Sequence, residues 1–476
     1  MSELNQRALR HWVSPIVLAA ALCALQLVAS WPGELIADSR EQLHQAMTRN
    51  YTDWHPPVMA LVWSWLLRLS GRPASLLVLH QLLHWLGFGL IADGCLRANM
   101  RREAWLILLA GAFPLFVFYD RIVLKDVGMA SALVAGAGIS IWFVVQHKAV
   151  PLWALLLSAL CITYGALIRT NAVFAIAPIL MLYGVRGRVF SYGTIIAWSL
   201  IATLLALPLS NWVNHKLIGA RAQYPVQSLQ IFDLMGIAVH AEDPAVWGAQ
   251  PPTMQEIRDC YTAYWWDPVS PWGVCPSLRR QIGYSTNIDS TQPQVVAETS
   301  RLWRAAILRH PVAYLVHRVE HFNASVYFFV PAYDFRYSKS AELVPFGSRS
   351  VSQRDIALDY LRVNFLCWPV FWLGLGVCAL AMLGIAREGP VEVAIARLLI
   401  SSGLMFSAAY FLVGVATDVR YHYWTAMSIL LGVILASREL MSRIRGRKLS
   451  ARFAVIGLAL IVLLGYLARI ADVHFT

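Results

Sequence analysis

Long apolar stretches separated by short polar segments recur along most of the chain. A helix needs about 20 apolar residues to cross the hydrocarbon core of a bilayer. The pattern therefore predicts an all-α polytopic membrane protein with about eleven transmembrane helices. The stretches that reach or approach this length are Val13–Trp31, Leu76–Leu96, Ala104–Tyr119, Val127–Gln146, Val150–Ile168, Ala172–Gly184, Ser191–Ser210, Val363–Ile385, Val393–Ala416, Tyr421–Ser437 and Phe453–Ile470.

Pro57–Leu69 is a shorter apolar stretch that follows a Pro-Pro pair. Counting it as a further span would place the basic segment Arg97–Arg102 outside, although Lys and Arg are enriched on the cytoplasmic side. We therefore predict a helix near the outer membrane surface, within a first outer loop at 32–75. Ala172–Gly184 is also short, and it is the alternative position at which this alternation of sides would fail.

The longest polar stretch lies between Asn211 and Arg362 and contains about 150 residues. We predict a mostly helical extracytoplasmic region there. The chain then has three parts: an N-terminal transmembrane module at 1–210, the extracytoplasmic region at 211–362 and a C-terminal transmembrane module at 363–476. Cys260 and Cys275 lie in the middle part, so they can form a disulfide if this region faces an oxidising compartment.

The composition changes the range of functions to consider. Hydrophobic residues make up 58% of the chain and charged residues 14%, whereas an ordinary soluble domain has roughly 25% charged residues. This excludes a conventional water-soluble enzyme. The net charge of +12 comes largely from basic residues in short segments between apolar stretches. That distribution indicates the cytoplasmic loops of an inner (plasma) membrane protein and no nucleic-acid partner.

Placing the N-terminus in the cytoplasm puts much of the unusual polar sequence on the outer face. Because successive spans alternate in direction, polar segments far apart in the sequence then share one side of the membrane. This coincidence is the main functional indication in the sequence. The segments that share the outer face are Pro32–Pro56, Asp120–Asp126, Arg169–Asn171, 211–362 and Thr417–Arg420.

Two carboxylates in the first outer loop are catalytic candidates. Asp38 follows the first span closely, and Asp53 begins the sequence Asp-Trp-His-Pro-Pro, which also contains His55. A carboxylate near the membrane surface suits a general base, which needs hydrogen-bond reach to its proton and a tuned pKa. The alternative is that both aspartates cap short helices, since Asp is a favoured N-cap.

Cationic candidates occupy the other outer segments. Lys125 beside Asp126 suits an anionic head group, whereas Arg169 and Arg420 suit a phosphate because a guanidinium binds it bidentately. The alternative for each is an interfacial anchor with local ion pairing. Together these side chains predict an outer site that contains a carboxylate, a lysine and two arginines.

The large polar region offers weaker indications. The aromatic segments Trp266–Gly273 and Tyr333–Tyr337 suit sugar stacking, although such mixtures are equally common in ordinary interfacial loops. Val295–Phe329 has the composition of a helix lying along the membrane surface. The sequence has no Walker loop, GxSxG or HExxH motif, so it does not indicate ATP-driven transport or a common type of hydrolase.

Several short motifs resemble those of the membrane-embedded GT-C glycosyltransferases, which include the protein O-mannosyltransferases and the aminoarabinose transferase of lipid A. Family members have an acidic residue early in the first outer loop, an HPP or KPP element later in that loop, and a large outer region after the seventh span. The layout covers nearly the whole chain, whereas each motif is short and degenerate. The motifs are Asp38, Asp53-Trp54-His55-Pro56-Pro57, Lys125-Asp126, Arg169-Thr170-Asn171, Phe232–Ile237 and Asp418-Val419-Arg420-Tyr421.

The resemblance implies transfer of a sugar from a polyprenyl-phosphate donor to a lipid, glycan or protein acceptor of the cell envelope. It implies that Asp38 deprotonates the acceptor hydroxyl, and Asp53 is the second catalytic candidate. Some relatives use a divalent metal, but the outer loops lack a DxD element, which favours a reaction without a metal or other cofactor. A single displacement with inversion would need no covalent intermediate.

The same resemblance assigns a phosphate-binding role to the basic side chains. They would neutralise the charge that develops on the leaving phosphate, a form of electrostatic stabilisation that is usually the largest contribution to catalysis. His55 departs from the pattern, because relatives can have a lysine there. The implied donor-phosphate residues are His55, Lys125, Arg169 and Arg420, with Asp126 and Tyr421 in supporting roles.

Two other classes of protein remain alternatives. A transporter or flippase of lipid-linked saccharides would also present an outer site beside membrane lipids. Such proteins often show internal repeats and broken helices at the midplane, whereas here the polar residues gather at one face and the halves show no convincing repeat. A noncatalytic scaffold is the third class, and the cost of placing charges near hydrocarbon makes it less attractive.

Overall fold

The computed structural model describes residues 14–185, 190–270, 273, 275, 293–330, 344–345, 364–384, 389–446 and 448–471. Within these ranges the chain is almost wholly helical, which confirms the predicted all-α class. The described strands are β1 (Glu34–Leu35) and β2 (Val344–Pro345), which pair antiparallel. The aromatic segment Tyr333–Tyr337, and Pro271 and Trp272 of the segment Trp266–Gly273, lie outside the described residues.

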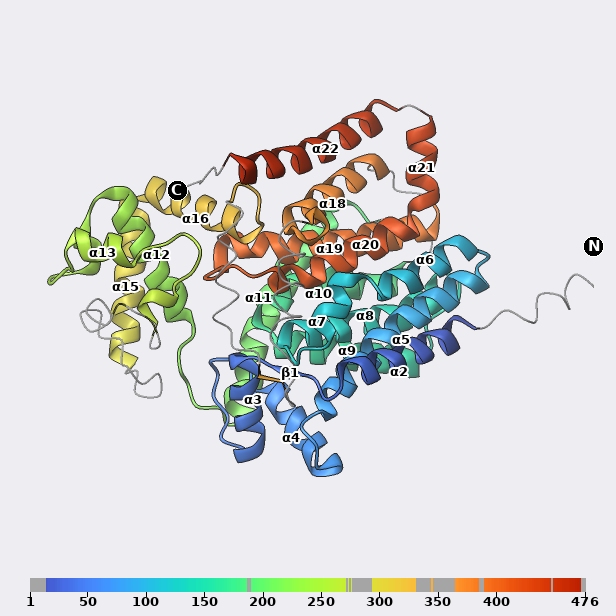
Figure 1. Ribbon diagram of the computed structural model, residues 1–476, viewed down its shortest axis with the longest axis horizontal. Coiled ribbons are helices and arrows are strands. Elements are labelled where there is room, and N and C mark those ends of the chain that lie inside the picture. Colours follow the sequence, from blue (N-terminus) through green and yellow to red (C-terminus); the bar gives the residue numbers. More distant parts are fainter. Residues whose placement is uncertain are drawn as a thin grey trace, which may run out of the picture.

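Most of the helices pack side by side in one apolar bundle, and a smaller group forms a lobe at one end of it (Figure 1). The lobe contains α12 (Val226–Ala241), α13 (Met254–Cys260) and α15 (Pro293–Arg309), and α16 (Pro311–Ser325) leads from it back to the bundle. The bundle contains α2 (Pro15–Ser30), α5 (Ser75–Arg97), α6 (Arg101–Gly111), α7 (Pro114–Asp120), α8 (Lys125–Val144), α9 (Leu152–Ile168), α10 (Val173–Leu180), α11 (Tyr192–Trp212), α18 (Pro369–Leu383), α19 (Val391–Val413), α20 (Tyr423–Leu435), α21 (Ser437–Arg445) and α22 (Leu449–Ile470).

Short turns of other helix types connect these elements. The 3-10 turns η2 (Thr170–Ala172) and η3 (Met181–Gly184) flank α10, and a π-helical turn, η4 (Val213–Leu217), extends α11. The 3-10 turn η10 (Val419–His422) leads into α20. The remaining 3-10 turns are η5 (Pro244–Trp247), η6 (Asp267–Val269) and η9 (Phe365–Cys367).

Within the described ranges, five helices are long and apolar enough to cross a membrane, and the number rises to seven if two bent pairs each form one span. One bend divides a predicted stretch: Ala104–Tyr119 forms α6 and α7, with a bend of 43° before Pro114, because proline cannot continue the hydrogen-bond ladder of a helix. The other bend, of 65°, lies between α20 and α21, where the predicted stretch Tyr421–Ser437 ends. Four other predicted stretches form helices of 10–17 residues, so the count of eleven spans stays a prediction.

The segment between α2 and α5 forms α3 (Ala37–Thr48) and α4 (Val58–Ser70), which lie side by side against the bundle (Figure 1). One face of α4 is fully buried at Met59, Ala60 and Trp63. The indole of Trp63 also donates a hydrogen bond to the carbonyl of Pro73 at 2.9 Å. The opposite face leaves Leu69 85% exposed. This two-sided character is typical of a helix at an interface.

The core of the bundle depends on small residues where α5 meets α8. A Cβ added at Gly138 would lie 2.7 Å from the carbonyl oxygen of Gly87, and one added at Gly87 would lie 2.6 Å from the backbone of Val134. Glycine therefore lets the two helix backbones approach closely, as is common between membrane helices.

We expect Gly138→Leu to lower the apparent melting temperature of the purified protein in detergent. The added side chain meets a rigid backbone, so the cost is about 1–3 kcal/mol. Gly457→Ala in α22 is the control, because a Cβ there meets nothing within 4 Å. Equal melting temperatures for the two variants would contradict this account of the core.

Candidate functional site

The candidate site is organised around Asp38, the second residue of α3. Its carboxylate lies 3.5 Å from the ammonium nitrogen of Lys125, at the start of α8, and 3.3 Å from the guanidinium of Arg420, on η10. Nε2 of His55 is 3.8 Å away. The Asp38 side chain remains 27% exposed. Three segments that are distant in the sequence thus bring basic side chains to one partly accessible carboxylate.

The protonation of this group follows from its surroundings. Burial alone would raise the pKa of Asp38, but the positive charges of Lys125 and Arg420 outweigh that effect and hold the pKa well below its usual range. Burial, followed by the positive charge of Lys125, lowers the pKa of His55 to about 3. His55 is therefore neutral near pH 7, and its Nδ1 accepts a hydrogen bond from Lys125 at 2.6 Å.

Arg169 lies between α9 and η2 and is held by groups from three other segments. Its guanidinium forms an ion pair with the buried carboxylate of Asp126 and donates a hydrogen bond to the Tyr410 hydroxyl at 2.6 Å. The guanidinium carbon also lies 5.0 Å from the ring centroid of Tyr421. The rings of Tyr410 and Tyr421 stack at 5.6 Å. These contacts fix the direction in which the arginine points.

Arg420 stands between two carboxylates. Its Nε lies 3.1 Å from Asp418, and its Nη2 makes the contact with Asp38. Asp418 also accepts hydrogen bonds from the Arg420 backbone amide at 2.9 Å and from the Tyr119 hydroxyl at 3.2 Å. Burial raises the pKa of Asp418. One terminal nitrogen of Arg420, Nη1, is buried with no hydrogen-bond partner among the described residues, so it is a donor that a ligand oxygen can use.

The structure thus brings together most of the side chains that the sequence singles out. Asp418 and Tyr410 join them, although sequence reasoning gave neither a role. The aspartate had a visible signal, because it precedes Arg420 in the quoted motif. The tyrosine lies within an apolar stretch, where nothing marks it. The predicted residues that meet are Asp38, His55, Lys125, Asp126, Arg169, Arg420 and Tyr421.

Asp53 has different partners. Its carboxylate accepts a hydrogen bond from the backbone amide of Gln223 at 2.5 Å and lies 3.3 Å from Nε2 of His215. Burial raises its pKa. The neighbouring Thr52 forms a β-bridge with Arg221. Asp53 therefore joins the segment between α3 and α4 to the chain that follows α11, and its described contacts do not include the basic residues around Asp38.

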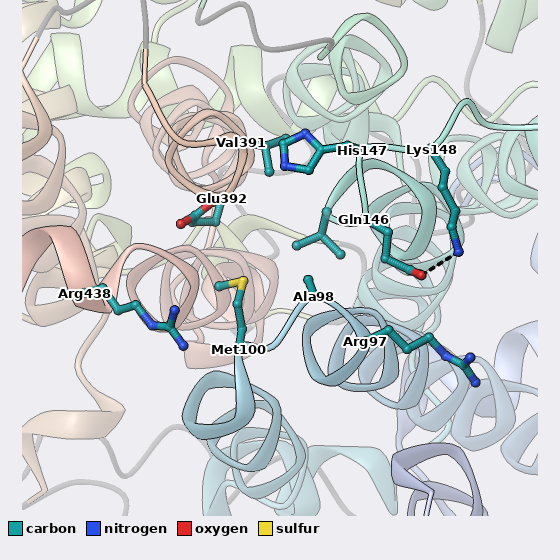
Figure 2. Close-up of a pocket in the computed structure, with 10 residues that line it drawn as sticks. Arg97, Ala98, Met100, Gln146, His147, Lys148, Val391, Glu392 and Arg438 are labelled. Atoms are coloured by element: carbon teal, nitrogen blue, oxygen red, sulfur yellow. Dashed lines mark hydrogen bonds between the residues drawn. The ribbon is translucent and has the colours of Figure 1, made fainter. Parts of the chain in front are cut away.

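A cavity of about 390 Å³ lies at the other end of the bundle (Figure 2). The cavity lies beyond the last turn of α8, and Lys125 is the first residue of that helix. Because α8 has 20 residues, its two ends are about 30 Å apart. The arginines at its rim have carboxylate partners: Arg97 is 2.5 Å from Asp93, and Arg438 is 2.9 Å from Glu103. The cavity is separate from the candidate site.

Metal binding has no visible donor set in this part of the molecule. Across the described ranges, no group of three or more His, Cys, Asp or Glu side chains is placed to hold a metal ion.

Comparison of the chain with known protein families, with curated proteins and with solved structures returned no match. The chemistry of the site must therefore be argued from its own residues.

We expect Asp126→Asn to destabilise the protein strongly. The substitution leaves the guanidinium of Arg169, whose side chain is 8% exposed, without its buried counter-charge, at a cost of about 3–5 kcal/mol. Thermal unfolding in detergent measures the effect. The exposed Asp259→Asn on α13 is the matched control, and a melting temperature for Asp126→Asn equal to that of the control would show that the pair is dispensable.

Proposed function

We propose that this chain is an integral membrane glycosyltransferase of the GT-C type. It transfers a sugar from a polyprenyl-phosphate donor to a lipid, glycan or protein acceptor at the outer face of the membrane. The observation that carries the proposal is the meeting of Asp38 with Lys125 and Arg420 at one end of an apolar helical bundle. A lipid-linked phosphate would place its charge at this end of the bundle and its apolar chain against the helices.

The topology of the proposal has eleven spans. The five long helices, the bent pair α6–α7 and α20 of the second bent pair contribute seven, and α21 belongs to the cytoplasmic loop that follows α20. Four shorter helices complete the set: α2, α9, the Thr170–Gly184 segment and α18. Two features support the orientation. Basic residues of the expected cytoplasmic loops, Arg97 and Arg438, line the cavity at the end opposite the candidate site. The disulfide between Cys260 and Cys275 is typical of an oxidising compartment outside the cytoplasm.

In the proposed reaction the donor phosphate lies against Lys125 and Arg420, with neutral His55 beside it. Asp38 accepts the proton of the acceptor hydroxyl as the acceptor oxygen bonds to the anomeric carbon. The bond from that carbon to the phosphate oxygen breaks, and its electron pair remains on the departing phosphate. Lys125 and Arg420 stabilise the charge that develops there. The stereochemical outcome is inversion, because the displacement occurs in one step.

The other residues of the cluster act through these groups. Asp126 and Tyr421 orient Arg169, which adds positive charge beside the phosphate. Asp53 takes no part in the proton transfer in this scheme, because its contacts lie with Gln223 and His215. Before the donor binds, Lys125 and Arg420 hold the pKa of Asp38 low. A phosphate that shares these cations weakens their hold on the carboxylate, so donor binding increases its basicity.

We expect Asp38→Asn to reduce transfer by about 10²–10⁴-fold, the usual contribution of a positioned acid or base. Mass spectrometry of lipid-linked sugars and envelope glycans, in cells with each variant, measures the missing sugar and the accumulated donor. Glu41→Gln is the control, because it changes a carboxylate on the same helix that contacts only Gln45 among its described partners. Full transfer by Asp38→Asn would remove the central assignment.

Arg420→Ala tests the phosphate contact. We expect the KM for the donor to rise about tenfold or more, since a charge-assisted contact to phosphate is lost, while the KM for the acceptor changes little. Arg68→Ala, at the exposed end of α4, is the control. Unchanged donor KM and kcat would argue against a phosphate role.

Purified protein that moves a lipid-linked sugar across liposomes without transferring it would instead favour a flippase.

A further inference from the structure

An ion pair outside the candidate site is buried in the lobe. Arg318 of α16 pairs with Asp233 of α12, and neither side chain is exposed. The indole of Trp303 donates a hydrogen bond to the same carboxylate at 2.7 Å, and Nε2 of His317 lies 3.3 Å from it. Burying two charges is costly even when they pair, so such a pair is weak evidence for stability alone. It can instead favour one arrangement of the chain over others.

The second contact of Arg318 reaches out of the lobe. One guanidinium nitrogen donates a hydrogen bond to the carbonyl of Gly414 at 2.7 Å. Gly414 follows α19 and lies four positions before Asp418. A Cβ added there would lie 2.6 Å from Nε2 of His321. Any residue larger than glycine would therefore collide with α16, which lies close to the backbone at this position. The buried pair therefore fixes the start of the loop at 414–422, which carries Arg420.

Two further contacts hold the same loop. The backbone amide of Trp266 donates to the carbonyl of Val415 at 2.9 Å. At the other end, the hydroxyl of Ser325 is 3.0 Å from Nε2 of His422, whose Nδ1 lies 2.6 Å from Ser407. The lobe thus holds the start of the loop, and the last residue of α16, which leads out of the lobe, holds its end. The part between these contacts contains Arg420, which the proposed function places against the phosphate, and its carboxylate partner Asp418.

We propose that the lobe positions this loop for phosphate binding, and that Arg318, through its contact with Gly414, is the main positioning residue. The identity of the ligand rests on the proposed function. The mechanical part, which is the positioning of the 414–422 loop by Arg318 and the lobe, does not. An arginine that binds a phosphate works best when its own backbone and rotamer are held in place beforehand. Without these contacts from the lobe, the loop would become ordered only when the phosphate binds, and the entropy lost in ordering it would lower the affinity.

Hydrogen exchange of the full chain in nanodiscs tests the mechanical part. We expect the amides of the 414–422 loop to exchange about tenfold faster in Arg318→Met, because a hydrogen bond from a charged group is lost. Arg318→Lys should restore part of the protection, since it keeps the charge. His310→Gln is the matched control: it breaks a 2.9 Å pair with Asp243 in the same lobe, away from the loop. Equal loop exchange in Arg318→Met and this control would overturn the proposal.

Direct binding of a polyprenyl phosphate to the same nanodiscs tests the functional part. We expect Arg318→Met to weaken affinity about tenfold, with Arg420→Ala giving the reference loss. If Arg420→Ala leaves affinity unchanged while Arg318→Met loosens the loop, the proposed function fails and the positioning role stands. If Arg420→Ala weakens binding but Arg318→Met alters neither exchange nor affinity, the positioning role fails.

A milder variant covers the case in which Arg318→Met does not fold. Ser325→Ala removes only the contact with His422 and leaves the buried pair intact. We expect faster exchange confined to the end of the loop, at 419–422, and a threefold to tenfold loss of phosphate affinity, about the effect of one hydrogen bond. If Ser325→Ala changes neither the exchange at 419–422 nor the phosphate affinity, the proposal that these contacts position the loop would be contradicted.

Discussion

Charge burial beside apolar helices is the constraint on which this structure depends. A carboxylate or a guanidinium placed there is tolerated only if an opposite charge meets it. Asp38 on α3 meets Lys125 and Arg420, and Asp126 on α8 meets Arg169. Each pair joins segments that are far apart in the sequence, so satisfying the charges also fixes how the ends of the helices near Asp38 assemble. The candidate site and the packing of these ends therefore have the same physical cause.

This constraint explains why much of the site could be predicted from the sequence. Alternation of sides is a one-dimensional rule, and it assigns each polar segment to one end of the bundle without knowledge of packing. Charged residues at the edges of apolar stretches, such as Lys125 and Arg169, are visible for the same reason. The structure places both in one cluster with Asp38. Helical character was equally accessible, because it follows from the length and composition of each stretch.

Other features depend on three-dimensional packing and left no such signal. Asp53 and Asp38 look alike in the sequence, yet Asp53 binds the Gln223 backbone because Thr52 pairs with Arg221. Tyr410 lies within an apolar helix, and only its stacking on Tyr421 brings it to Arg169. The ends of some helices were also hidden: Pro114 divides a stretch that hydropathy alone treats as continuous, whereas Pro208 lies within the continuous helix α11.

The balance of charge within the cluster bears on what it can bind. Because His55 is neutral, the cations Lys125, Arg169 and Arg420 face as many carboxylates, namely Asp38, Asp126 and Asp418. A free phosphate must then compete with carboxylates already in place, so charge alone gives it little affinity. A ligand that also buries an apolar chain gains about 25 cal/mol for each Å² removed from water. Under the proposed function, the same neutrality that weakens binding of soluble anions favours a phosphate carried by a lipid. A phosphate that shares Lys125 and Arg420 would then leave Asp38 free to act as a base.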